Sequence, residues 1–147
     1  MALDDLGLGA ALSSYVQSWS SHLGIPVDLH AAGLDRGRLT IEIETVLYRI
    51  AQEALNNVAK HAQATNVAIV LEQRAGQVVL IIEDNGTGFD LQTVLDTDEK
   101  ALGLIGMRER AAVVGGNIEL ESQSNSGTTV VVRIPVPNGP ETGTTDE

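Results

Sequence analysis

Two runs of β-branched and aliphatic residues, 67-VAIVLEQ-73 and 78-VVLIIE-83, are separated by only four residues, 74-RAGQ-77. Two such runs around a short connection that contains glycine are typical of a β-hairpin. A two-stranded hairpin is only marginally stable by itself, because its apolar side chains must be buried against something else. The rest of the chain therefore has to supply helices or further strands that pack on this pair.

Helical patterns on both sides of the hairpin supply this cover. Residues 8–23 repeat apolar side chains at helical spacing and stop before Gly24 and Pro26. Residues 42–62 carry the strongest pattern, with one apolar stripe that consists of Val46, Leu47, Ile50, Ala54, Leu55 and Val58. A further helix is predicted to start at Gly103 and to end near Val114, just before two glycines.

Additional strand patterns extend the sheet. Residues 117–122 and 128–134 predict a second hairpin that turns at 125–127, and residues 25–31 predict a short strand. We therefore expect an α+β fold, a two-layer sandwich in which helices cover one face of a mainly antiparallel sheet. The length of 147 residues fits one domain, and its core is expected to be aliphatic, because only 3% of the residues are aromatic.

Charge and cysteine content narrow the function. The chain has 20 acidic and 9 basic residues and a formal net charge of −11. This argues against nucleic acid and anionic membranes as partners, because both are bound mainly by Lys and Arg. It leaves a polyphosphate ligand open, since backbone amides and a metal ion can hold phosphates. The absence of cysteine excludes disulfides and thiolate metal sites, and no apolar run is long enough to span a bilayer.

One face of the central predicted helix combines unusual polar residues. Glu53, Asn57 and His61 follow each other at intervals of four residues, with Lys60 beside them. Asn is a modest helix former but a good oxygen ligand for Mg2+, and a carboxylate one turn away can orient or deprotonate an attacking group. Lys60 is suited to a phosphate. The alternative for each residue alone is an ordinary solvated helix face.

The segment 84-DNGTG-88 follows directly on an apolar strand. The Asp84 carboxylate accepts hydrogen bonds only, which suits an exocyclic amine such as that of adenine. Gly86 and Gly88 would let a flat ring approach the backbone. The alternative is a plain hairpin turn.

The segment 101-ALGLIGMRERA-111 places two glycines at the expected start of a helix. The free amides of such a start form an anion site, and the alternative is a helix start that glycine merely softens. Thr128 opens the last strand, where its hydroxyl is free to add a hydrogen bond or simply suits the strand. P-loop, dinucleotide-binding and Ser/Thr/Tyr protein-kinase motifs are absent. His22 and His30 show no sign of a functional role.

The order and spacing of these segments resemble the ATP-binding catalytic domain of sensor histidine kinases, in the superfamily shared by gyrase, the heat-shock chaperone ATPase and MutL. The resemblance runs from about Leu34 to Pro135. The segment 52-QEALNNVAKHA-62 is similar to the N box, 84-DNGTG-88 and 103-GLIGMRERA-111 to the two glycine boxes, and 127-GTTVVVRIP-135 to the closing strand. The combination points to the subfamily paired with helix-turn-helix response regulators. It implies a Bergerat-type ATP-binding fold, with a mixed, mainly antiparallel sheet and helices on one face.

The resemblance also implies residue roles. Asn57 would coordinate Mg2+, Glu53 would position the γ-phosphate, and Lys60 would approach phosphate. His61 would lie near the nucleotide. Asp84 would accept from the adenine amine, helped by Thr128 through water, and Gly86 and Gly88 would make room for the ring. The amides of five consecutive residues would contact the phosphates: Gly103, Leu104, Ile105, Gly106 and Met107. Residues 89–102 would form a lid over ATP.

Activity and organisation are implied in the same way. The domain would bind Mg-ATP and donate the γ-phosphoryl group to a histidine on the dimerisation domain of its parent kinase, for relay to a response regulator. Ala101 departs from the family's usual glycine and is expected to reduce activity. We expect one catalytic domain over residues 1–136, with residues 1–12 left from a linker after the dimerisation helices, and a disordered tail over 137–147.

The excised domain is expected to be a cytoplasmic monomer that turns over little ATP by itself, without contact with nucleic acid or membrane. The parent kinase itself is either soluble or membrane-bound. Two alternatives stay open at this point. The chain would be a serine kinase or self-contained ATPase of the same superfamily, or a degenerate module that only binds a partner protein.

Overall fold

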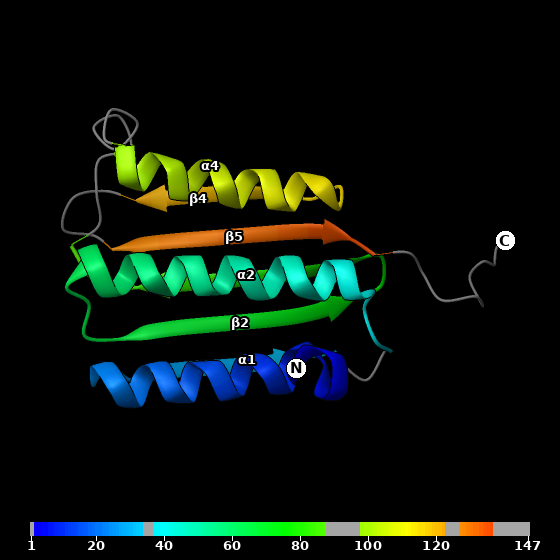
Figure 1. The fold of residues 1–147 in the computed structure, drawn as a ribbon, viewed down its shortest axis with the longest axis horizontal. Helices are drawn as coiled ribbons and strands as arrows, with labels where there is room; N and C mark the ends of the chain where they lie inside the picture. The colour runs from blue at the N-terminus through cyan, green and yellow to red at the C-terminus, as the bar shows by residue number, and fades with distance from the viewer. Residues whose placement is uncertain (1, 34–36, 88–97, 123–126, 137–147) are drawn as a thin grey trace, which may run out of the picture.

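The computed structural model describes residues 2–33, 37–87, 98–122 and 127–136. Helices cover one face of a five-stranded sheet (Figure 1), so the predicted two-layer α+β sandwich is confirmed. The elements in chain order are α1 (Ala2–Leu23), β1 (Val27–Ala32), α2 (Ile41–Asn57), the π-helical turn η2 (Val58–Ala62), β2 (Val67–Arg74), β3 (Gln77–Asp84), α4 (Asp98–Val113), β4 (Asn117–Ser122) and β5 (Thr128–Pro135).

The sheet has the strand order β1-β2-β3-β5-β4. Both predicted hairpins are present as antiparallel pairs, β2 with β3 and β4 with β5. The short strand β1 pairs with β2 in parallel, and α2 lies between these two strands in the chain, as a parallel connection requires. Strand β3 is central, and its last residue, Asp84, lies opposite Val67 of β2 and Thr128 of β5.

The core lies between the helices and the inner face of the sheet, and it is aliphatic as expected. On β2, every second residue from Val67 to Leu71 is fully buried, which is the alternation of a strand that is covered on one face. The stripe on α2 faces these residues, and Leu47, Ile50 and Leu55 are almost inaccessible to solvent. In Figure 1, α2 lies over the middle of the sheet, α1 runs beside it along the β1 edge, and α4 beside it along the β4 edge.

A capping residue marks the start of α2, and a glycine interrupts α1. Thr40 caps α2, because its side-chain oxygen accepts a hydrogen bond from the amide of Ile43 at 3.3 Å. Helix α1 starts earlier than the predicted residue 8 and is interrupted at Gly7, which has a φ of 84° and a ψ of 174°. Only glycine adopts this φ easily, and the interruption turns the first residues of the helix away from its axis.

Some predicted features fall on residues that the structure does not describe. The tail at 137–147, Gly88, most of the predicted lid (residues 89–97) and the turn residues 125 and 126 lie outside the described residues. Among the described residues, no helix combines the length and the apolar character that a membrane span requires.

Candidate functional site

Asp84 ends the central strand as a buried carboxylate. Only 7% of the residue is exposed, because β2 and β5 flank it on both sides. The amide of Gly86 donates a hydrogen bond to Asp84 Oδ1 at 2.8 Å. Burial raises the pKa of Asp84 above its ordinary value of 3.8, and hydrogen bonds from the amides of Gly86 and Thr128 oppose this effect only in part. The site thus holds a desolvated acceptor at the start of the glycine-containing turn.

Gly127, the residue before strand β5, approaches the backbone of Asp84 very closely. Gly127 has a φ of 78°, and a Cβ atom there would lie 2.2 Å from the carbonyl oxygen of Asp84, so only glycine fits. The hydroxyl groups of Thr128 and Ser122 lie 2.8 Å apart and share a hydrogen bond. The predicted Thr128 therefore does lie beside Asp84, and its hydroxyl is held in place by β4.

Asn85 joins the turn after β3 to the segment that follows η2. Its Oδ1 accepts hydrogen bonds from the amides of Thr65 at 3.0 Å and Asn66 at 2.9 Å, and its Nδ2 donates to Thr65 Oγ1 at 3.0 Å. The backbone amide of Asn85 adds a bond to the Asn66 carbonyl at 3.3 Å. The sequence motif made Asn85 look like a turn residue only, so this role was missed. Its preference for side-chain bonds to nearby backbone was the available signal.

The polar face predicted on the central helix begins on α2, and its later residues lie in η2. Glu53 and Asn57 lie one turn apart on α2, both half-buried. The α-helix ends at Asn57, however, and Val58–Ala62 form a π-helical turn that ends at Gln63 with a φ of 52°. The helical segment therefore extends to residue 62 as predicted, but its last turn is π-helical and not α-helical. Lys60 is exposed in this turn.

Helix α4 brings the second glycine segment against Glu53 and Asn57. A Cβ atom on Gly103 would lie 2.8 Å from Glu53 Oε2 and 3.9 Å from Asn57 Nδ2. Any larger residue at position 103 would thus push on the polar face of α2. The structure unites three of the predicted site residues in one cluster: Glu53, Asn57 and Gly103.

The predicted start of this helix is wrong. Helix α4 begins at Asp98, five residues before Gly103, and includes Ala101. Only the first four amides of an α-helix lack an internal partner, so the amides of residues 103–107 belong to the helical hydrogen-bond ladder. The side chain of Met107 is buried in the core, whereas Ile105 is 48% exposed. The two glycines thus lie inside α4 and not at its start, because the five residues before Gly103 are helical as well.

These parts meet at one edge of the sandwich. Figure 1 shows that the end of α2, the start of α4 and the start of β5 lie at the same side of the molecule. The end of β3 lies there too, because Asp84 pairs with Thr128 at the start of β5. Among the described residues, no group of three or more His, Cys, Asp or Glu is arranged to hold a metal ion. A hard cation held here would take the side-chain oxygen of Asn57 as its protein ligand, and oxygens of the bound ligand and of water as the rest.

Comparisons with known proteins agree with this arrangement. Residues 42–138 match the family model described as "Histidine kinase-, DNA gyrase B-, and HSP90-like ATPase". The chain is 40% identical over 136 residues to the signal transduction histidine-protein kinase/phosphatase DegS of Brevibacillus brevis, covering 92% of this chain and 34% of that protein. It is 40% identical over 135 residues to the oxygen sensor histidine kinase NreB of Staphylococcus carnosus, covering 92% of this chain and 38% of that protein.

Solved structures show the same fold. The blue-light activated histidine kinase of Erythrobacter litoralis EL346 matches with a TM-score of 0.70 at 24% identity, over 88% of this chain and 45% of that chain. The mycobacterial sensor histidine kinase MprB matches with a TM-score of 0.65 at 18% identity, over 88% of this chain and 95% of that chain. This chain spans about a third of the length of the curated relatives it matches.

Proposed function

The chain belongs to the family of histidine kinase-, DNA gyrase B- and HSP90-like ATPases, and from this premise we propose that it binds Mg-ATP and supplies the γ-phosphoryl group to a histidine on a dimerisation domain. The buried carboxylate of Asp84 carries the proposal. A carboxylate that is 7% exposed, with a raised pKa, is costly unless a ligand makes use of it.

The proposed role of Asp84 is to accept a hydrogen bond from the exocyclic amine of adenine. The oxygen Oδ1 already accepts from the Gly86 amide, which orients the carboxylate. The corresponding edge of guanine carries an oxygen, which would leave two acceptors facing each other without a proton. We therefore expect ATP to bind and GTP to be rejected. Gly86 and Gly88 would leave room for the ring, and Thr128 would assist through water.

Asn57 and Glu53 fit a magnesium site. Mg2+ usually takes one or two protein oxygens and completes its shell with waters and phosphate oxygens, and α2 offers one amide and one carboxylate a single turn apart. When bound, the ion would neutralise charge on the phosphates. In this proposal Asn57 binds the ion through its amide oxygen. Glu53 holds the γ-phosphate end in position.

The phosphates would also be met by Lys60, which is exposed in the π-helical turn η2, while His61 would lie near the nucleotide. Contacts from the amides of residues 103–107 stay a prediction. They would require the first turns of α4 to unwind, since these amides lie inside the helix. Gly103 would also assist phosphate binding through its lack of a side chain, because this leaves the Glu53 carboxylate free to face the phosphates.

The partner is proposed to be a dimerisation domain that carries the acceptor histidine, with a response regulator receiving the phosphoryl group from it. The relatives named above are histidine kinases that are longer than this chain, which supports this division of labour. The 147-residue chain is proposed to be monomeric and cytoplasmic. We expect it to bind nucleotide and to turn over little ATP unless the acceptor domain is present.

Calorimetric titration tests the nucleotide site. ATP with Mg2+ should bind in the micromolar range, equivalent to about −7 to −8 kcal/mol, and GTP should not compete. Asp84→Asn and Asn57→Asp should each weaken binding. If Asp84→Asn kept the affinity and the preference for ATP, the adenine assignment would be refuted.

A transfer assay tests the acceptor. The domain is mixed with labelled ATP and the separate dimerisation domain of the DegS relative, and the product is then treated with acid. Phosphohistidine is lost in acid, whereas phosphoserine survives. An acid-stable product would favour a serine kinase of the same family, and nucleotide binding without any transfer would leave only the binding part of the proposal standing.

A further inference from the structure

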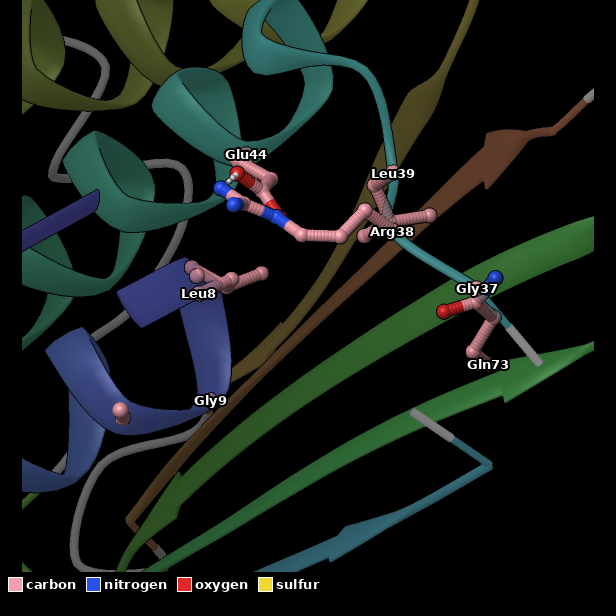
Figure 2. Close-up of a pocket in the computed structure, with 9 residues that line it drawn as sticks. Leu8, Gly9, Gly37, Arg38, Leu39, Glu44 and Gln73 are labelled. Carbon is pink, nitrogen blue, oxygen red and sulfur yellow. Dashed lines mark hydrogen bonds and ion pairs between the residues drawn. The ribbon is translucent and has the colours of Figure 1, made fainter. Parts of the chain in front are cut away.

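A pocket lies far from the proposed ATP site, at the opposite end of α2. It has a volume of about 170 Å³ and is formed by the start of α1, the loop before α2, the first turn of α2 and the end of β2. The residues that matter are Leu8, Arg38, Leu39, Glu44 and Gln73, and we call this cavity the Gln73 pocket (Figure 2). Glu44 and Asn57 are 13 residues apart on the helix, which is about 20 Å along its axis.

Gln73 is a polar residue in a position where the strand pattern calls for an apolar one. It follows Val67, Ile69 and Leu71 on the inner face of β2 and is 8% exposed. Its Oε1 atom is the single buried side-chain oxygen or nitrogen in the described part of the chain that lacks a hydrogen-bond partner. Figure 2 shows its carboxamide pointing towards Gly37, with the oxygen on the side of Leu8 and Arg38. A buried acceptor without a donor costs free energy, so the pocket is incomplete without a donor.

The other polar side chains of the pocket are Glu44 and Arg38, which form an ion pair. The Glu44 side chain is 4% exposed, and its two oxygens accept hydrogen bonds from Arg38, Oε1 from Nη2 at 2.7 Å and Oε2 from Nε at 3.3 Å. A carboxylate offers about four lone-pair positions, so two remain after these bonds. Leu8 and Leu39 add apolar surface. The pocket thus combines the unpaired Gln73 oxygen, a carboxylate that is ion-paired with Arg38 but keeps free lone-pair positions, and an aliphatic wall.

We propose that the Gln73 pocket binds a small organic cation that carries N–H donors on a short aliphatic stem, an alkylguanidinium or alkylammonium group. The donors bond to Gln73 Oε1 and Glu44, and the stem lies against Leu8 and Leu39. The same chemistry belongs to a free metabolite and to an arginine or lysine side chain. The site is independent of the nucleotide, since none of its residues belongs to the Asp84 or Glu53–Asn57 cluster.

NMR titration of the whole chain with butylguanidinium chloride tests the proposal. Saturable shifts are expected in the backbone amides of Leu8, Arg38, Leu39 and Gln73. Tetramethylammonium at the same concentration is a cation without N–H donors and should not reproduce them. If it does, or if butylguanidinium causes no saturable shift, the pocket holds only water and the proposal is wrong.

Two substitutions of opposite effect make the test specific. Gln73→Leu removes the acceptor and should weaken binding at least about tenfold, the loss expected for one hydrogen bond to a charged donor. Gln73→Glu adds a negative charge at the same place and should tighten binding. The matched control is Gln17→Leu, because Gln17 is exposed on α1 outside the pocket and should leave the affinity unchanged. Equal affinities in both Gln73 variants and the control would overturn the proposal.

Two further measurements complete the design. ATP binding should be the same in Gln73→Leu as in the parent chain, which shows that the variant is folded and that the two sites are separate. Titration with N-acetylarginine amide distinguishes the sources of the cation. Binding of this capped residue points to a protein side chain, and binding of butylguanidinium alone points to a metabolite.

Discussion

Replacement of Gly103 by alanine should separate stability from activity. The added Cβ atom would lie 2.8 Å from Glu53 Oε2. Comfortable contact for such atoms is about 3.5 Å, so the carboxylate must move by roughly 0.7 Å, the difference between the two distances. Glu53 is half-buried, and its carboxylate lies at the end of a flexible side chain, so this movement costs little energy. It displaces the group that is proposed to position the γ-phosphate.

The expected effects of Gly103→Ala on stability and on phosphotransfer have opposite signs and different causes. Position 103 lies inside α4, where alanine is more favourable than glycine by about 0.8–1 kcal/mol. We therefore expect the free energy of unfolding to stay the same or to rise by up to about 1 kcal/mol. Misplacing a catalytic group by about 1 Å can cost on the order of 100-fold in rate. The phosphotransfer rate should therefore fall by at least about tenfold, while ATP affinity changes much less.

The assays are urea denaturation, ATP titration and phosphotransfer to a dimerisation domain. Gly106→Ala is the control for helix propensity, because its Cβ would meet only the flexible end of Arg110, at 3.4 Å. It should stabilise α4 by a similar amount and reduce transfer far less than Gly103→Ala does. A Gly103→Ala variant that transfers phosphate at the parent rate would refute the role of this contact. Equal losses in both variants would show that α4 flexibility matters and Glu53 does not.

Three other substitutions or conditions test the site. Asp84→Asn should weaken ATP binding by roughly 10- to 100-fold, because a hydrogen bond to a charged acceptor is lost. It should not lower stability at neutral pH, since burial raises the pKa of Asp84 and thus disfavours the charged form. Marked destabilisation in urea would contradict this expectation. In the parent chain, the raised pKa means that Asp84 contributes most to stability when it is protonated. This contribution declines as the pH rises from about 3.8 through the folded-state pKa. Asp84→Asn should therefore abolish this part of the pH profile of unfolding. ATP affinity should fall on acidification as Asp84 is protonated, starting at a higher pH than for an ordinary aspartate, and a titration series from pH 7 to about pH 4 checks this. Asn85→Ala removes three side-chain hydrogen bonds at an exposed position. It should lower the free energy of unfolding by about 1–2 kcal/mol and weaken ATP binding. Asn85→Asp keeps the acceptor oxygen and should recover most of the stability, and equal effects of both changes would show that the Oδ1 bonds are unimportant.

The parts of the fold that sequence predicts are those with a period. Residues 67–73 and 78–83 alternate around a short connection, and the stripe on residues 42–58 faces the same core, so both elements follow from burial of one face. The two antiparallel hairpins are local and were therefore predictable. The parallel pairing of β1 with β2 is not, because it depends on α2 packing across the sheet.

The errors at the site have physical causes as well. Gly103 looked like a helix start because glycine disfavours helix interiors, but packing of α4 against α2 outweighs a propensity of about 1 kcal/mol. The π turn at Val58–Ala62 leaves no signal in a pattern of apolar residues, since Val58 satisfies the stripe in either geometry. The bonds of Asn85 join residues about 20 positions apart, so they appear only when β2 and β3 are paired.

The positions that break ordinary rules of stability indicate where this chain binds other molecules. At one end of α2 they are a buried carboxylate, a glycine inside a helix, a π turn and a left-handed glutamine at position 63. Natural sequences keep such costly features mainly where function requires them. Within the described residues, the one buried side-chain acceptor without a donor belongs to Gln73, at the other end of the same helix. The rule that supports the proposed nucleotide site therefore applies equally to the Gln73 pocket, and a leucine at position 73 should make the protein more stable if no ligand ever fills it.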